Sequence, residues 1–486
     1  MNEEILKLEP AVVWSYFREI LEIPRPSKKE EKIVEYLLNF GKKHNLETLQ
    51  DEVGNVLIRK SATKGMENRE SVVLQSHIDM VCEKNSDKIH DFNNDPIESL
   101  IEDGWVTANG TTLGADDGIG IAAQLAILSS NEIVHGPVEC LFTIDEETGL
   151  TGAFGLQPGF LKSNILLNLD SEDDGQIFIG CAGGQDTLAW LPYDKVEIPE
   201  GYKSFKIMVS GLKGGHSGDE INQNRGNANK ILNRFLWANL NDLDIKLSNF
   251  DGGNLRNAIA REAFAIIMVP IEKADDLNSR LPIFEKDVRA EYHISEPDLK
   301  ISISNTEDPE FVVDTESTDE FLNAVYACPH GVIAMSQDID DFVETSTNLA
   351  SVKFQEGEIL ITTSQRSSIE SAKFDISNMV ASVFKLAGGR IEHSDGYPGW
   401  KPNANSKIVA QTAEAYERLF NQKPEVLAIH AGLECGLIGD KYPEMDMTSY
   451  GPTIKRAHSP DEKIEIETVE KFWELTLDIL KNIPKV

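Results

Sequence analysis

The chain has 486 residues, of which 41% are hydrophobic, and its 81 acidic against 46 basic residues give a formal net charge of −35 at pH 7. This length predicts at least two hydrophobic cores. The large negative charge disfavours binding to nucleic acids and to anionic membrane surfaces, so we expect neither kind of partner.

The N-terminal segment is acidic, with Glu3, Glu4 and Glu9, where a signal peptide would be basic. Residues 5–21 have the apolar spacing of one amphipathic helix. No apolar run approaches the ~20 residues of a membrane-spanning helix. The five cysteines are odd in number, widely spaced and without a CxxC pair, which indicates a reducing cytoplasm and no disulfide framework.

The first candidate site follows a buried-type strand over residues 71–76. His77 and Asp79 then lie on the same side of an extended chain. The histidine could bind a metal while the aspartate fixes its ring orientation. A hydrogen-bonded structural histidine is the commoner explanation for such a pair in isolation.

A glycine-rich segment over residues 113–118 leads into an apolar helix that extends to residue 128. Its tight turn would let Asp116 project into a cleft, where two carboxylate oxygens can bridge two cations. Either Asp116 or Asp117 could instead be an ordinary helix N-cap.

The strand-like residues 140–144 are followed by three acidic residues, Asp145, Glu146 and Glu147. Such a concentration of negative charge is costly unless solvent or cations neutralise it. A solvated acidic turn is therefore the alternative to a metal site.

A further strand over residues 164–169 ends at Asp170, and His458 lies in a loop before the last amphipathic helix. In an open α/β sheet the carboxyl ends of the strands line one crevice, so ligands that are distant in sequence can converge there. Two nitrogen and three carboxylate ligands form the mixed set expected for two zinc ions, with manganese or cobalt as substitutes. These ligands are His77, Asp116, Glu147, Asp170 and His458.

Four motifs together resemble, in order and spacing, those of the M20 co-catalytic metallopeptidases. The similarity spans almost the whole chain and is greatest to the aminoacyl-histidine (Xaa-His) dipeptidase branch. The motifs are residues 76–79, 114–118, 145–149 and 457–460.

The resemblance implies a role for each residue of the site. Asp116 would bridge the metals, with His77 and Asp170 completing one site and Glu147 and His458 the other. Glu146 would act as the general base towards a metal-activated water. Asp79 would orient His77.

A glycine-framed loop carries His216, which the resemblance identifies as the donor that polarises the scissile carbonyl. An incidental histidine in a glycine-rich hairpin is the alternative. Arg366 follows a strand over residues 358–364 and, by the same resemblance, would take the substrate carboxylate, for which its planar fork is suited. A surface arginine in an acidic protein is nearly as good an explanation.

Residues 429–436 form another candidate substrate-binding loop, with His430, Gly432 and Glu434. A helix-capping turn would explain the glycine equally well. A dipeptidase also needs an anion for the substrate ammonium, and Glu434 or Asp117 could supply it.

Alternating strand and helix patterns from about residue 31 to 183 predict an α/β fold with a mostly parallel sheet. We expect a catalytic domain of the zinc-exopeptidase type, interrupted by a large α+β lid. Its parts would be residues 1–183 and 397–486, with the lid over residues 184–396. The lid resembles the doubled lid of the dipeptidase branch, and by analogy it suggests a homodimer.

These observations favour a cytoplasmic dizinc dipeptidase for unblocked dipeptides, preferentially Xaa-His, with β-alanyl-histidine as a candidate substrate. An N-acyl amino acid amidohydrolase could use the same metal site, but it would need an apolar acyl pocket in place of an anion. A non-catalytic metal- or peptide-binding protein is disfavoured, because Glu146 would serve catalysis rather than metal affinity.

Overall fold

The computed structural model describes residues 3–403 and 405–486. Its contacts divide the chain into two compact units. Unit 1 extends to Gly180 and includes Pro402–Ala428 and Leu433–Val486, whereas unit 2 comprises Cys181–Lys401 and Ile429–Gly432. The main divisions thus follow residues 180 and 401, close to the limits of 183 and 396 predicted for the lid. The short segment Ile429–Gly432 belongs to unit 2, whereas the predicted second part of the catalytic domain, residues 397–486, includes it.

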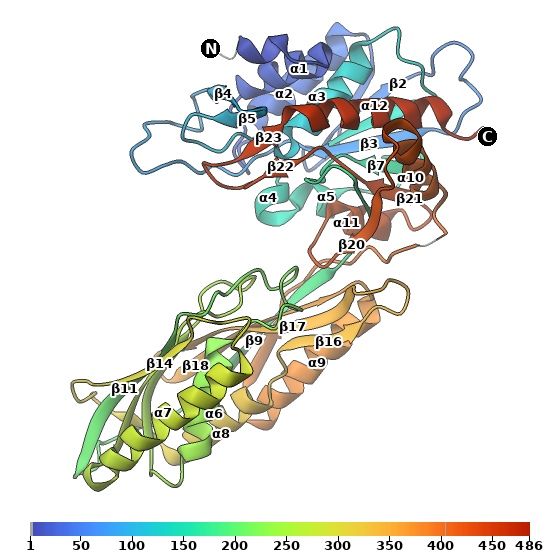
Figure 1. The fold of residues 1–486 in the computed structure, drawn as a ribbon. Helices are drawn as coiled ribbons and strands as arrows, with labels where there is room; N and C mark the ends of the chain where they lie inside the picture. The colour runs from blue at the N-terminus through green and yellow to red at the C-terminus, as the bar shows by residue number, and fades with distance from the viewer. Residues whose placement is uncertain (1–2, 404) are drawn as a thin grey trace. The chain divides into compact units, whose positions relative to one another are not determined.

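Unit 1 is built on an eight-stranded sheet whose central strands β6, β3, β7 and β21 are parallel (Figure 1). All residues of β3, β6 and β7 are buried, as expected for a sheet covered on both faces. The prediction of an α/β fold with a mostly parallel main sheet is confirmed. In spatial order the strands are β1 (Glu47–Gln50), β2 (Val56–Lys60), β6 (Val138–Thr143), β3 (Val72–His77), β7 (Ile165–Asn168), β21 (Asp446–Ser449), β8 (Gln176–Cys181) and β20 (Glu425–Ile429).

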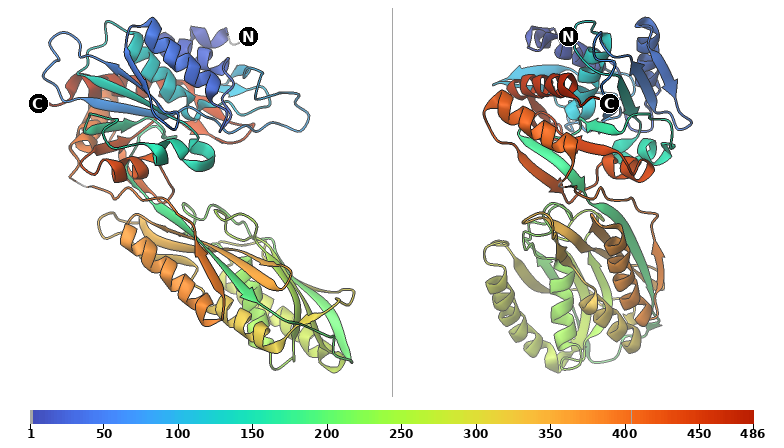
Figure 2. Two further views of the ribbon diagram at one scale, coloured as in Figure 1. Left: turned by 180° about the vertical axis from the view of Figure 1, so that it is seen from behind. Right: turned by 90° about the vertical axis from the view of Figure 1, so that its right-hand side faces the viewer.

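Helices and a small second sheet complete unit 1. Helix α3 packs on α1 and β3, and α10 packs on α12, the red helix beside it in Figure 2. The helices are η1 (Glu4–Lys7), α1 (Ala11–Leu21), α2 (Glu31–Lys43), α3 (Ala115–Ser129), α4 (Glu146–Gly149), α5 (Thr151–Gly155), α10 (Lys407–Phe420), α11 (Glu434–Lys441) and α12 (Ile466–Asn482). The small sheet has the order β22 (Ile454–Lys455), β23 (Lys463–Glu465), β5 (Trp105–Ala108) and β4 (Ser99–Glu102).

The single helix predicted over residues 5–21 was wrong. A short 3-10 helix ends at Lys7, and α1 begins only at Ala11. Proline disfavours helical backbone in the residue before it but suits the start of a helix, so Pro10 separates the two segments.

Unit 2 is built on a nine-stranded sheet in which every pairing is antiparallel. The strands β14, β11, β13 and β12 form one group with α6 and α7. The strands β17, β18, β9, β19 and β16 form a second group, which joins the first through a short pairing of β12 with β17. The strands are β9 (Gly183–Pro192), β11 (Tyr202–Ser210), β12 (Lys246–Gly252), β13 (Ala263–Pro270), β14 (Lys300–Asn305), β16 (Gly331–Met335), β17 (Val343–Phe354), β18 (Glu358–Ser367) and β19 (Arg390–His393).

Side chains of the sheet and its helices share one hydrophobic core in unit 2. The helices are α6 (Ala228–Asn239), η2 (Ile271–Lys273), α7 (Ala274–Glu291), α8 (Thr315–Ala327) and α9 (Glu370–Leu386), and a two-stranded ladder pairs β10 (Lys195–Val196) with β15 (Val312–Val313). Within the described part of the chain, no helix has both the length and the apolar character needed to cross a membrane.

Candidate metal and substrate site

Three strands of the parallel sheet end next to the predicted ligands. Strand β3 ends at His77 itself, β6 ends four residues before Glu147, and β7 ends two residues before Asp170. The carboxyl ends of these paired strands lie at one edge of the sheet, which brings residues from distant parts of the sequence together.

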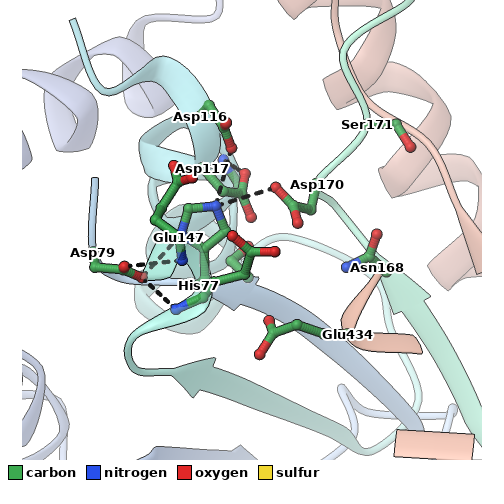
Figure 3. A network of polar contacts seen from close by, with 12 residues as sticks. His77, Asp79, Asp116, Asp117, Glu147, Asn168, Asp170, Ser171 and Glu434 are labelled. Carbon is green, nitrogen blue, oxygen red and sulfur yellow. Dashed lines mark hydrogen bonds and ion pairs between the residues drawn. The ribbon is translucent and has the colours of Figure 1, made fainter. Parts of the chain in front are cut away.

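The five predicted ligands form two groups that share Asp116. His77 Nε2 lies 3.0 Å from Asp116 Oδ1 and 3.3 Å from Asp170 Oδ1. His458 Nε2 lies 3.0 Å from Asp116 Oδ2 and 3.0 Å from Glu147 Oε2. Each oxygen of Asp116 therefore faces a different histidine. Figure 3 shows His77, Asp116 and Asp170 pointing toward one another.

The separations between ligand atoms within each group are close to those around one bound zinc ion. Zinc binds nitrogen and oxygen at about 2.0–2.2 Å, so two ligands of one tetrahedral ion are roughly 3.3–3.5 Å apart. The observed separations of 3.0–3.3 Å need little adjustment to reach that range. The second oxygen of Glu147, Oε1, is buried and accepts no hydrogen bond from any residue that the structure describes.

The electrostatics of the cluster also favour a cation. Hydrogen bonds to Asp116 and Glu147 raise the pKa of His458 to about 11. Burial raises the pKa of Asp170 to about 7, and burial likewise raises that of Glu172 to about 8, with the charge of Asp116 contributing to both. Several carboxylates thus share a space in which they repel one another, and positive charge relieves that repulsion.

The backbone before α3 explains how Asp116 reaches the cluster. Gly114 has a left-handed φ of 69°, and Asp116 and Asp117 are both non-helical although they lie at the start of α3. Asp117 Oδ1 accepts the backbone N–H of Gly120 at 3.1 Å, which is a helix-capping contact. The sequence left open whether these aspartates cap the helix or project into a cleft. In the structure Asp117 makes the capping contact and Asp116 faces the two histidines.

Asp79 lies between His77 and the acidic segment. Its Oδ1 is 3.3 Å from His77 Nδ1 and accepts the backbone N–H of Glu146 at 3.0 Å, while Oδ2 accepts that of Glu147 at 3.2 Å. The carboxylate of Glu146 has an oxygen within 4.8 Å of ligand atoms of His77 and Glu147. Desolvation raises the pKa of Glu146 well above its ordinary value, and the charge of Asp170 raises it further.

The acidic turn is ordered by a residue that takes no part in the ligand groups around Asp116. Asp145 is buried and accepts hydrogen bonds from the hydroxyls of Thr148 and Thr151. Its backbone N–H donates to Glu30 at 3.1 Å. The alternative of a solvated acidic turn does not hold, because residues 146–149 form the helical turn α4 and Asp145 before it is buried.

Glu434 is fully buried in unit 1, at the start of α11. Its Oε2 accepts hydrogen bonds from Gln75 Nε2 and Thr143 Oγ1, both at 2.6 Å. Its Oε1 is buried and meets no donor among the described residues. Burial raises the pKa of Glu434 to about 7, and Figure 3 places the side chain below His77 and Asp170.

Unit 2 contains the remaining predicted residues. The Nδ1 atom of His216 accepts the backbone N–H of Asp219 at 3.2 Å and lies 3.0 Å from the Asp219 carboxylate. Gly218 fits closely between the His216 ring and the backbone carbonyl of His430. Unit 2 thus brings His216 and His430 together.

Arg366 lies at the end of β18, beside the same histidines. It donates through Nη1 to the hydroxyl of Tyr397 at 3.0 Å, and its charge lowers the pKa of His430 in addition to the larger effect of burial. Its Nε has no acceptor in the described residues. His430 Nε2 lies 2.7 Å from Ser346 Oγ.

Gly432 has a packing reason to be glycine. A Cβ at this position would lie 2.9 Å from the ring of Tyr397, and a Cβ at Gly184 would lie 2.7 Å from the same ring. The two glycines therefore admit the tyrosine that holds Arg366. The capping explanation is not needed, since Leu433 is the N-cap residue of α11.

Sequence reasoning missed two buried charged residues beside the predicted metal ligands, Arg25 and Glu462. It also missed the buried hydrogen-bond chain that leads from Glu434 through Gln75 to Asn168. Arg25 lies between Pro24 and Pro26, and Glu462 lies between the charged residues Asp461 and Lys463. No local pattern therefore distinguishes Arg25 or Glu462 from a solvated residue.

The sequence matches the model of peptidase family M20/M25/M40 over residues 73–482. A relative from Escherichia coli (strain K12), the cytosol non-specific dipeptidase, is 46% identical over 481 residues, covering 99% of each chain.

Solved structures show the same relationship. The aminoacylhistidine dipeptidase from Vibrio alginolyticus superposes with a TM-score of 0.93 at 46% identity, covering 100% of this chain and 99% of the other. Aminopeptidase PepT from Bacillus cereus shares the fold, with a TM-score of 0.58 at 16% identity over 98% of this chain and 99% of its own.

Proposed function

The chain belongs to peptidase family M20/M25/M40 and is therefore a metallopeptidase, and on this premise we propose that it is a dizinc dipeptidase. The proposed substrates are unblocked dipeptides, preferentially Xaa-His, and β-alanyl-histidine is a candidate among them. The observation that carries the proposal is the position of Asp116, whose two oxygens face two different histidines at 3.0 Å.

In this proposal His77, Asp116 and Asp170 hold one ion, and Asp116, Glu147 and His458 hold the other. Mn²⁺ or Co²⁺ could replace zinc in such a mixed nitrogen and oxygen set. When bound, a metal pair lowers the pKa of water and polarises the peptide carbonyl.

We assign the proton transfers to Glu146. Its carboxylate accepts a proton from the attacking water and donates it to the leaving amine. The raised pKa of Glu146 supports the second step, because a carboxyl group must be protonated to act as an acid. Asp79 orients the His77 ring and holds the backbone of Glu146 through the two contacts described above.

The residues of unit 2 would bind and polarise the substrate. We propose that His216 donates a hydrogen bond to the scissile carbonyl oxygen as charge develops on it, with Asp219 fixing its ring. Arg366 would bind the free carboxylate, and the unpaired Nε leaves donor capacity for that contact. His430 is proposed as a second substrate contact, and Gly432 as a residue that makes room for the site.

The amino end of the substrate distinguishes the dipeptidase from the N-acyl amino acid amidohydrolase. A dipeptide presents an ammonium group, which needs a nearby anion, whereas an acyl group needs an apolar pocket. The buried carboxylate of Glu434, with its unpaired Oε1, supports the dipeptidase. We propose that Glu434 receives the substrate ammonium.

The relatives support two further parts of the proposal. The Escherichia coli relative is named a cytosolic enzyme, and we accordingly propose a cytoplasmic location. The Vibrio alginolyticus enzyme is named for aminoacylhistidine, which supports the preference for Xaa-His. We also propose a homodimer through unit 2, by analogy with the family.

The test is hydrolysis of Gly-His, Ala-His, β-alanyl-histidine, Gly-Leu, a tripeptide and N-acetyl-histidine by chelator-stripped enzyme, before and after zinc is added. We expect zinc-dependent release of amino acids from the free dipeptides, fastest for those ending in histidine. Preferential cleavage of N-acetyl-histidine would replace the proposal with the amidohydrolase. Inactivity on every substrate, with zinc bound, would replace it with a binding protein.

A further inference from the structure

Glu462 is a buried carboxylate that makes its contacts with the backbone of another segment. Its side chain is 2% exposed, although it follows exposed Asp461 in a loop of exposed and partly exposed residues. Its Oε2 accepts the backbone N–H groups of Leu113 at 2.8 Å and Gly114 at 3.0 Å, and its Oε1 accepts that of Ala115 at 2.7 Å. Three consecutive amides that precede Asp116 thus point at one carboxylate.

Arg25 complements this arrangement from the other end of the sequence. It is also 2% exposed, and its guanidinium donates to the backbone carbonyls of Ile78, Asp79 and Gly114. Arg25 therefore joins the segment that follows His77 to the segment that precedes Asp116. A Cβ on Gly114 would lie 2.6 Å from the guanidinium, so the glycine permits this close approach.

Glu462 in turn joins the segment before Asp116 to the loop that carries His458. It lies four residues after His458, in a loop where Arg456 and His458 both adopt left-handed backbone, with φ of 57° and 63°. Such a backbone conformation persists only where the surrounding structure holds it. The side chain of His458 is 52% exposed, so packing around the ring does little to hold it. The nearest buried anchor on its C-terminal side is Glu462.

We infer that Glu462 and Arg25 are positioning residues for the metal centre, which fix Asp116 relative to His458 and His77. This inference rests on the proposed dizinc function. Neither residue need touch a metal ion or the substrate. Glu462 sets the distance between Asp116 and His458, and Arg25 sets the distance between Asp116 and the segment of His77.

The opposing explanation is electrostatic, because any anion near the ligands attracts cations. Two substitutions of Glu462 distinguish this electrostatic explanation from the inferred positioning role. Glu462→Asp keeps the charge but is one methylene shorter, so it cannot reach all three amides. Glu462→Gln keeps the length but loses the charge and turns an N–H donor toward N–H donors. Asp461→Asn is the matched control, since Asp461 is exposed and, among the residues that the structure describes, forms an ion pair with exposed Arg456.

The experiment titrates each chelator-stripped variant with zinc by calorimetry. If Glu462 positions the ligands, both Glu462 variants should bind at least one zinc equivalent about 10–100-fold more weakly than the native chain, the usual effect of removing a group that supports a ligand. Asp461→Asn should stay within about twofold of native. Native zinc affinity in Glu462→Asp would overturn the inference, and so would an equal loss in Asp461→Asn.

Arg25→Lys provides a second route if the Glu462 variants do not fold. Lysine keeps the charge but cannot supply a planar fork to three carbonyls, so we expect the same selective loss of zinc affinity. A lower melting temperature with native zinc affinity would assign Arg25 a structural role alone and overturn its part. Dipeptide hydrolysis is measured separately. A native chain that binds two zinc ions but cleaves no dipeptide would sink the proposed substrate class and leave this inference standing.

Discussion

Asp79 accepts the backbone N–H of Glu146 at 3.0 Å, so the residue proposed to orient a metal ligand also holds the main chain of the proposed general base. Asp79→Asn would weaken the contact with the His77 ring and the contact with the backbone N–H of Glu146, because an amide has one acceptor oxygen instead of two. We expect zinc affinity to fall about 10–100-fold, the range for partners of ligating histidines, and turnover at saturating zinc to fall as well. Calorimetry and steady-state kinetics measure the two effects, and full recovery of turnover with excess zinc would restrict Asp79 to His77.

Glu146→Gln tests the proton transfers. The amide keeps the size of the side chain but cannot accept a proton, so turnover should fall at least about 100-fold, the lower end for a positioned acid or base. Metal content, measured on the dialysed protein, should remain native because Glu146 is not one of the five proposed ligands. Turnover close to native would exclude Glu146 as the base.

His216→Ala tests the proposed donor to the carbonyl. Loss of one such donor typically costs about 2.7–4 kcal/mol in the transition state, which corresponds to a fall in kcat of about 100–1000-fold. Metal content should not change, because the proposed ligands all lie in unit 1. His293→Ala is the matched control, since His293 is an exposed histidine of the same unit. Equal kinetics in the two variants would remove His216 from the chemistry.

Arg366→Met tests recognition of the substrate carboxylate. We expect the native enzyme to prefer Gly-His over Gly-His amide, and the variant to lose most of that preference because the charged partner is gone. The ratio of kcat/KM for the two peptides measures the effect directly. Arg256→Met, which removes an exposed arginine of unit 2, should keep the native ratio. An unchanged ratio in Arg366→Met would place the carboxylate site elsewhere.

The parallel sheet could be predicted because strand-like segments such as residues 140–144 alternate with helical patterns, and the five ligand candidates could be proposed because their motifs are local. The sequence did not predict that Pro10 would divide the first helix, although the proline was visible. The helical spacing of apolar residues continues on both sides of Pro10, so periodicity alone does not show where the helix begins.

The contacts around the proposed ligands could not be predicted in the same way. Glu462 and Asp461 are adjacent acidic residues, and only the three-dimensional path of residues 113–115 makes one of them buried. Tyr397 and Gly432 are likewise 35 positions apart (432 − 397) and meet only through packing. Such pairs leave no periodic or motif signal in a single sequence.

His430 should make the stability of the protein depend on pH. Burial, and then the charge of Arg366, lowers its pKa in the folded state from 6.5 to about 3. Between about pH 3 and pH 6.5 the unfolded chain takes up a proton at His430 that the folded chain does not. The contribution of His430 to the free energy of unfolding is therefore fully present above pH 6.5 and is lost as the pH decreases. At pH 5 the loss should be about 2 kcal/mol, from about 1.4 kcal/mol for each unit below 6.5.

The difference in urea midpoint between pH 7.5 and pH 5.0, measured on chelator-stripped protein, checks this expectation. His430→Gln keeps a polar atom near Ser346 Oγ but cannot ionise, so its difference should be smaller than that of the native chain. His293→Gln removes an exposed histidine and should leave the native difference unchanged. If His430→Gln loses as much stability as the native chain between the two pH values, then the folded state does not lower the pKa of His430, and neither its burial nor the Arg366 charge keeps the ring neutral.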